Sequence, residues 1–216
     1  MTKKDVFNLT VQCVVKEIEE NGFKFIKSKE RIIRKTDDGY DAILFRIVDY
    51  CTSFQIVFDI RTRTNVVEDI INKFMADCMN PQFMSLTETI ITSYQDLSNS
   101  KVNYIEIASE EHLNIAISEI IGLIRGIGMD FFEQNKNIEK VNVRKKNAIL
   151  YEHKGLGMHH DRRTLMQSLI LMKLCNDPDF DLLRYKYKEL YVPFDGEEIS
   201  GPKAIDDLIS YLENLP

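Results

Sequence analysis

The sequence lacks the features that place a chain in a membrane or cross-link it outside the cell. It has four cysteines among 216 residues, and no two form a CxxC pair, which argues against a disulfide framework. No stretch approaches the roughly 18 consecutive apolar residues of a membrane-spanning helix. The opening MTKKDVFNLTVQ has no apolar core of signal-peptide length. We therefore expect reduced thiols, a cytoplasmic location and no membrane partner.

Recognisable catalytic motifs are also missing. Neither GxSxG nor HExxH occurs, and the order around Gly126-Ile127-Gly128 fits neither a P-loop nor a dinucleotide fingerprint. We instead expect these two glycines and Gly122 to pack closely against another element of the fold. The sequence predicts no catalytic residue and no cofactor. The alternative is an enzyme whose site is assembled from distant residues.

Among the residues of this sequence, the histidines come closest to the pattern of a metal site or an active site. His159-His160-Asp161 is the densest cluster, yet adjacent side chains on a helix point about 100° apart and rarely share an ion. We predict no metal ligand, and expect Asp161 to serve the first turn of a helix. The enzyme alternative would combine residues such as Arg46, Asp59 and His160.

The composition indicates a folded chain with a net negative charge. Apolar residues make up 44% of the sequence, which is enough for a substantial core. The formal net charge is −6, which argues against sequence-independent binding of nucleic acid. A protein is therefore the expected kind of partner, and the oligomeric state is left open.

The stretch Tyr40–Arg63 shows the strongest structural pattern and predicts a long β-hairpin. Aromatic and β-branched residues alternate with other residues over both halves, which is the period of a half-buried strand. Ile43, Phe45 and Ile47 would share one face with Ile56 and Phe58. We expect Phe45, Ile56 and Phe58 to be nearly fully buried.

The opposite face of this hairpin is mixed in character, and it is the predicted partner-binding surface. An apolar centre with a charged surround is typical of protein interfaces. The alternative is that C-terminal helices cover this face. The predicted binding residues are Leu44, Arg46, Val48, Gln55, Val57, Asp59 and Arg61.

Local signals predict the remaining elements. We expect strands at 23–27, 31–35, 86–94 and 102–108, with a loop over 96–101. Helices are expected at about 3–20, from Asn65 as the capping residue to near Asn80-Pro81, from 109 to 131, and at 160–175, 178–190 and 202–214. Asn21-Gly22 should end the first helix, and Ser109 should cap the helix that runs to 131.

The order of these elements resembles a bacterial family of proteins of unknown function. The resemblance is carried by the Gly22-Phe23 step, the hairpin Ala42–Ile60, the segments IASEEHLNIAISEIIGLI and GMDFFEQ, and the late LILMKLCNDPDFDLLRYKYKEL. Some members of that family are thought to be immunity-like proteins near toxin genes. The resemblance brings no catalytic residues to carry over to this sequence.

Together these observations predict an α+β fold. We expect an antiparallel sheet of about five or six strands, with helices packed mainly on one face and a helical C-terminal portion. The chain is treated as one domain over 1–216, with a helical C-terminal subdomain from about 135 to 216 as a further division. The predicted function is a cytosolic interaction protein.

Overall fold

The computed structural model describes residues 1–75, 79–151, 160–192 and 200–215. The chain forms two compact units. Unit 1 comprises Met1–Arg63 and Ile90–Gln134, and unit 2 comprises Thr64–Thr89 and Asn135–Pro216. The second unit thus contains the C-terminal range that the sequence marked as helical, and it also includes a segment from the middle of the chain.

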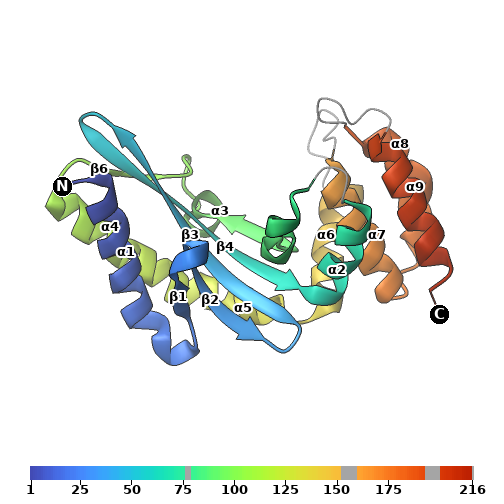
Figure 1. The fold of residues 1–216 in the computed structure, drawn as a ribbon, viewed down its shortest axis with the longest axis horizontal. Helices are drawn as coiled ribbons and strands as arrows, with labels where there is room; N and C mark the ends of the chain where they lie inside the picture. Colours follow the sequence, from blue (N-terminus) through green and yellow to red (C-terminus); the bar gives the residue numbers. More distant parts are fainter. Residues whose placement is uncertain (76–78, 152–159, 193–199, 216) are drawn as a thin grey trace. The chain divides into compact units, whose positions relative to one another are not determined.

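Unit 1 is built on one six-stranded antiparallel sheet, as the sequence predicted (Figure 1). The strand order is β1-β2-β3-β4-β5, and β6 pairs with another part of β4. The strands are β1 (Lys24–Ile26), β2 (Arg31–Thr36), β3 (Gly39–Tyr50), β4 (Ser53–Thr64), β5 (Ile90–Ser93) and β6 (Ile105–Ile107).

The β3–β4 hairpin is the longest part of this sheet, and its two strands are joined at Cys51-Thr52. Burial alternates over Leu44–Val48 and Gln55–Arg61, because one face packs into the core, whereas the four residues Tyr40–Ile43 are all buried. Phe45, Ile56 and Phe58 are only 8%, 0% and 1% exposed, which confirms the predicted inner row. In the β2–β3 pair, Ile32 lies opposite Ile43, so Ile32 rather than Ile33 points into the core.

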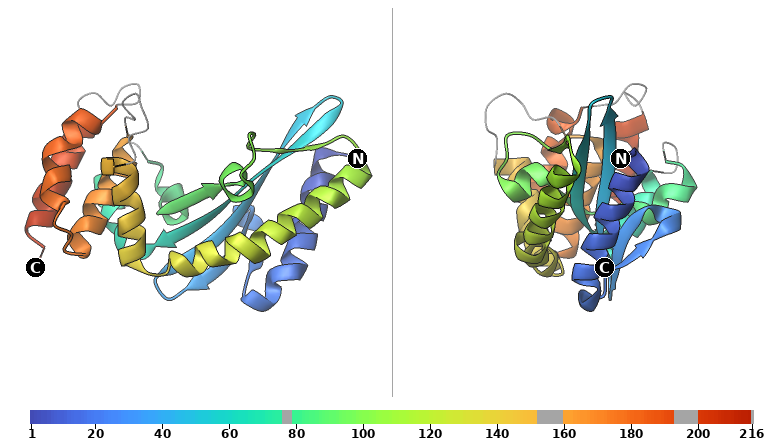
Figure 2. Two further views of the ribbon diagram at one scale, coloured as in Figure 1. Left: turned by 180° about the vertical axis from the view of Figure 1, so that it is seen from behind. Right: turned by 90° about the vertical axis from the view of Figure 1, so that its left-hand side faces the viewer.

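Helices of unit 1 pack on the inner face of the sheet. The helical segments are α1 (Lys3–Ile18), α3 (Tyr94–Ser98), α4 (Glu110–Leu123), a π-helical segment η4 (Ile124–Gly128) and α5 (Met129–Gln134). Short 3₁₀ turns η1 (Glu19–Asn21) and η2 (Lys27–Lys29) flank β1. Helix α1 contacts both β3 and α4, and the two helices lie side by side (Figure 2).

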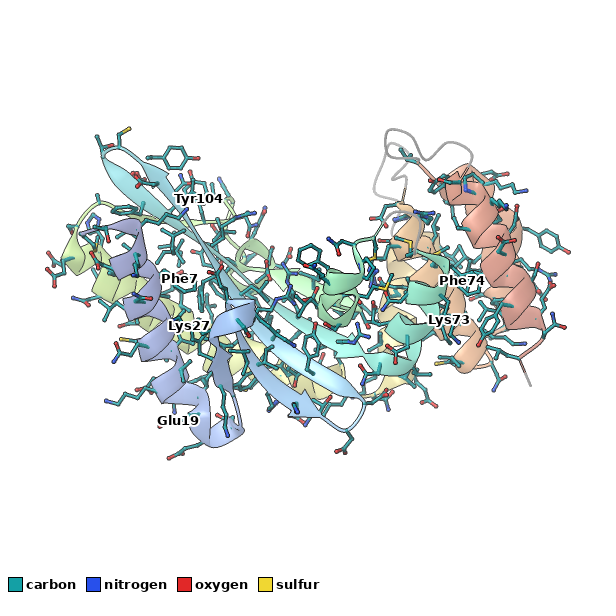
Figure 3. The ribbon with its side chains drawn as sticks, in the orientation of Figure 1. Phe7, Glu19, Lys27, Lys73, Phe74 and Tyr104 are labelled. Carbon is teal, nitrogen blue, oxygen red and sulfur yellow. The ribbon has the colours of Figure 1, made fainter. Side chains whose placement is uncertain are left out.

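Aromatic side chains join these helices to the sheet. The Phe58 ring lies 5.7 Å from that of Phe45 and 5.6 Å from that of Tyr94 on α3. Phe7 of α1, labelled in Figure 3, lies 6.1 Å from the Phe25 ring on β1. Such edge and tilted contacts bury large apolar areas, so the inner face is the core of unit 1.

The termini of these helices follow local sequence chemistry. Thr2 caps α1 through a reciprocal capping box with Asp5. Gly22, which has a φ of 87°, follows the helical turns that end α1, as Asn21-Gly22 predicted. The Ser109 hydroxyl accepts a hydrogen bond from the His112 N–H at the start of α4, which confirms Ser109 as the cap.

Unit 2 is helical in its described elements. They are α2 (Asn65–Phe74), η3 (Pro81–Leu86), α6 (Ile138–Lys146), the π-helical segment η5 (Asn147–Tyr151), α7 (Arg162–Leu174), α8 (Phe180–Leu190) and α9 (Ser200–Glu213). Helix α7 contacts α2, α6, α8 and α9, and most of its residues are buried. Phe74 at the end of α2 packs 5.6 Å from the Tyr211 ring of α9 (Figure 3).

Several local expectations were wrong. Thr64, not Asn65, is the N-cap of α2. The strand expected over 86–94 is confined to Ile90–Ser93, and helix α3 extends to Ser98 within the expected loop. Nothing lies within 4 Å of a Cβ placed on Gly122 or Gly126, so close packing is confirmed only for Gly128, where a Cβ would lie 3.6 Å from Ile60 Cδ1.

Candidate functional site

The predicted binding residues lie on the outer face of the hairpin, the face turned away from the inner row. Arg46 is exposed, and the other six are half-buried, so each retains accessible surface in the folded chain. This face is therefore accessible to a partner. The residues are Leu44, Arg46 and Val48 on β3, and Gln55, Val57, Asp59 and Arg61 on β4.

Strand pairing extends this outer face beyond the residues that the sequence identified. On β2, Arg31 lies opposite Leu44 and Ile33 lies opposite Ala42. On β5, Ile91 lies opposite Arg61 and is 54% exposed. Directly opposite residues share a face of the sheet, so Ile33 and Ile91 enlarge the apolar part of the surface, whereas Ala42 is fully buried.

The neighbours on β1, β2 and β6 add charge to this outer face. Lys24 lies opposite Ile33, Lys35 opposite Tyr40, and Glu106 opposite Gln55. We call the whole surface the outer face and define it by its members. They are Lys24, Ile26, Arg31, Ile33, Lys35, Tyr40, Ala42, Leu44, Arg46, Val48, Gln55, Val57, Asp59, Arg61, Ile91, Ser93 and Glu106.

Ion pairing on the outer face is uneven. The Arg61 guanidinium donates to both Asp59 carboxylate oxygens, at 2.5 and 3.1 Å, so these two charges largely neutralise one another. Lys24, Lys35 and Arg46 are exposed and form no ion pair with any residue that the structure describes. The pairing therefore leaves positive charge beside the apolar centre.

A second polar constellation lies inside unit 2, and its centre is the carboxylate of Glu68. The Glu68 side chain is 0% exposed. Its Oε1 accepts hydrogen bonds from Thr89 at 3.0 Å and from Gln167 at 2.9 Å, and its Oε2 pairs with Arg163. A buried carboxylate is tolerated when it is paired and hydrogen-bonded in this way.

Further contacts extend this network to the helix α6. Gln167 Nε2 also donates to the Glu88 carbonyl at 2.9 Å, while Gln167 Oε1 accepts from Lys145 Nζ at 2.6 Å. Burial lowers the pKa of Lys145 to about 8, and the charge of Asp161 acts in the opposite direction. The network thus links α2, α6 and α7 with the segment that precedes β5.

This Glu68 network was not predicted from the sequence. Its members are far apart along the chain, and none belongs to a recognised motif. The one available signal is Glu68 itself, an acid between the buried residues Val67 and Ile70 of α2. Because both carboxylate oxygens of Glu68 are engaged by donors, the arrangement serves to hold helices together.

The histidine cluster is only partly described. His159 lies outside the described residues, as does Cys78. His160 is 8% exposed, and its backbone donates to the Leu190 carbonyl and accepts from the Val192 N–H. Asp161 caps α7 by accepting from the Thr164 N–H at 2.7 Å, which confirms its expected helix-start role.

Metal ligands, membrane-spanning helices and thiols complete the description of possible binding features. Over the described ranges, no group of three or more His, Cys, Asp or Glu residues is arranged to hold a metal ion. No helix in the same residues is long and apolar enough to cross a membrane. Cys13, Cys51 and Cys175 are free thiols.

Comparisons with known proteins give no further guidance. The chain matched no protein-family model, no curated protein and no solved structure.

Proposed function

We propose that this chain is an interaction protein that binds a protein partner through the outer face of its sheet. The observation that carries the proposal is the contrast between the two faces of the β3–β4 hairpin. The inner face forms the core, with Ile56 and Phe58 almost fully buried. The outer face keeps accessible apolar residues beside exposed charge.

The composition of the outer face fits a protein partner. Leu44, Val48 and Val57 supply apolar area, and Arg46 stands between the first two on the same face of β3. Interfaces of this kind combine an apolar centre with a polar rim that excludes water. The resemblance to a family with some immunity-like members agrees with a role in binding another protein.

The Glu68 network gives less support to an enzyme. A general acid or base must be within reach of a substrate. Glu68 is fully buried, and its two oxygens are occupied by Thr89, Gln167 and Arg163. The alternative set Arg46, Asp59 and His160 also lacks a free carboxylate, because Asp59 is paired with Arg61.

The test is capture from cells that make this protein. Tagged wild-type protein is compared with the double variant Leu44→Asp/Val57→Asp, and captured proteins are identified by mass spectrometry. We expect at least one protein to be captured by the wild type and lost by the variant. Circular dichroism and the thermal midpoint of each variant report whether it is folded.

A matched control introduces the same two charges elsewhere on unit 1. Ile115 and Ile127 are 59% and 55% exposed on α4 and η4, so Ile115→Asp/Ile127→Asp changes equally apolar surface positions. This control should capture the partner as well as the wild type does. Undiminished capture by the Leu44→Asp/Val57→Asp variant, or loss with the control alone, would place the binding surface elsewhere.

A further inference from the structure

We propose that the partner presents an acidic, extended polypeptide segment in which carboxylates alternate with apolar side chains. This inference rests on the proposed function, because it specifies what the outer face binds. It follows from the charge, the spacing and the apolar content of that face.

The outer face is positive although the chain is acidic. It carries five basic residues, Lys24, Arg31, Lys35, Arg46 and Arg61, and two acidic ones, Asp59 and Glu106. Five minus two gives a local charge of +3, whereas the whole chain has a formal charge of −6. A surface of opposite sign to the rest of the protein attracts and orients a partner of complementary charge.

The pair between Asp59 and Arg61 removes one charge of each sign, so the local charge stays at +3. Asp59 is engaged by Arg61, while Lys24, Lys35 and Arg46 have no ion-pair partner among the described residues. An exposed cation next to apolar surface gains most from an anion that also excludes water from the contact. The unpaired cations therefore favour carboxylates on the partner.

The spacing of side chains on β3 favours an extended segment. Leu44, Arg46 and Val48 follow one another at alternate positions and share one face. Alternate residues of a strand lie about 7 Å apart. A partner strand that presents an apolar side chain, a carboxylate and another apolar side chain has the same repeat, so each group meets its complement.

Apolar content distinguishes this partner from nucleic acid. A phosphate backbone has no apolar groups to cover Leu44, Val57 and the exposed Ile91. Single-stranded nucleic acids are usually held by aromatic stacking on a strongly basic groove. The net charge of −6 on the whole chain also opposes binding of a polyanion.

The probe is a fluorescent peptide with the repeat Val-Ser-Glu-Ser, which places valine and glutamate in turn on one face of an extended strand. We call it the glutamate–valine peptide; it is titrated with the full-length protein and followed by fluorescence anisotropy. Three comparison ligands separate the contributions. In the lysine–valine peptide every glutamate of this repeat is replaced by lysine, in the second peptide every valine is replaced by serine, and the third ligand is a short DNA duplex. We expect the glutamate–valine peptide to bind best, and its binding to weaken as salt is raised.

Charge reversal locates the site. The double variant Arg46→Glu/Lys35→Glu should bind the glutamate–valine peptide about tenfold more weakly at low salt. The matched control, Lys140→Glu/Lys186→Glu, changes the net charge equally at two exposed lysines of unit 2 and should bind as the wild type does. Amide NMR signals of β2, β3 and β4 should shift when the peptide is added to the wild type.

Each contrary result overturns the inference without deciding the proposed function. Equal binding of the lysine–valine peptide or of DNA removes the acidic polypeptide as the ligand. An equal loss of peptide binding in both double variants would show an effect of net charge rather than of a specific site. Failure of the glutamate–valine peptide to bind also refutes it, whereas the proposed function is decided separately by capture with the Leu44→Asp/Val57→Asp variant.

Discussion

Replacing Lys145 with methionine should remove a pH-dependent part of the stability of this protein. The Lys145 ammonium donates to Gln167 inside unit 2, where burial lowers its pKa to about 8 from the ordinary lysine value of 10.5. In the unfolded chain the ordinary value applies. Between these two pKa values the unfolded state binds a proton that the folded state has lost.

The sign of the effect follows from proton linkage. Because the unfolded state holds more protons between pH 8 and 10.5, the free energy of unfolding rises with pH across this window. One pKa unit corresponds to about 1.4 kcal/mol, so the difference amounts to about 3 kcal/mol. This free-energy difference is an upper bound, because Lys145 is half-buried and water partly screens its charge.

The assay is urea unfolding of wild type and Lys145→Met over a series of pH values, followed by circular dichroism. Other groups also change protonation on unfolding in this range, since burial raises the pKa of Cys175 and that of Tyr187 above their unfolded values. Subtracting the variant from the wild type cancels them. The difference in unfolding free energy should increase in favour of the wild type by up to about 3 kcal/mol from neutral pH to pH 10.5.

The exposed Lys140 lies on the same helix and provides the control. The Lys140→Met variant should show a nearly constant difference from wild type. A constant difference for Lys145→Met as well would refute the buried position of the Lys145 ammonium.

Three further predictions concern stability and thiols. Phe58→Ala should lower the free energy of unfolding by about 3–5 kcal/mol through lost burial and a cavity, and an unchanged urea midpoint would contradict the inner row. Glu68→Ala should cost about 3–5 kcal/mol because it leaves Arg163 without its buried carboxylate, and a cost below that of an exposed site such as Asp69→Ala would refute the network. A thiol assay on the unfolded, unreduced protein should count four reactive cysteines, and a count of two or none would indicate disulfides.

The hairpin could be predicted because its signal is local and periodic. Alternation over Phe54–Ile60 specifies which side chains face the core without knowledge of distant residues. The helix starts at Thr2 and Ser109 are also local, since a hydroxyl accepts from an N–H three residues later. The α+β class and the six-stranded sheet followed from such signals.

The Glu68 network and the division into units depend on contacts between distant segments. Nothing in the α2 sequence shows that Glu68 meets Gln167, or that this helix joins the C-terminal helices in one unit. The positive charge of the outer face was missed for the same reason. Its cations on β1 and β2 join Arg46 only when the strand register is known.

Site-specific photo-crosslinking in the native host tests the central claim most directly. A photoreactive amino acid is placed at Gln55 on the outer face, and in a second protein at Ile115 on α4. The proposed function predicts a crosslinked partner from position 55 and none from position 115. A partner crosslinked from position 115 alone, or no crosslink from position 55, would contradict binding through the outer face.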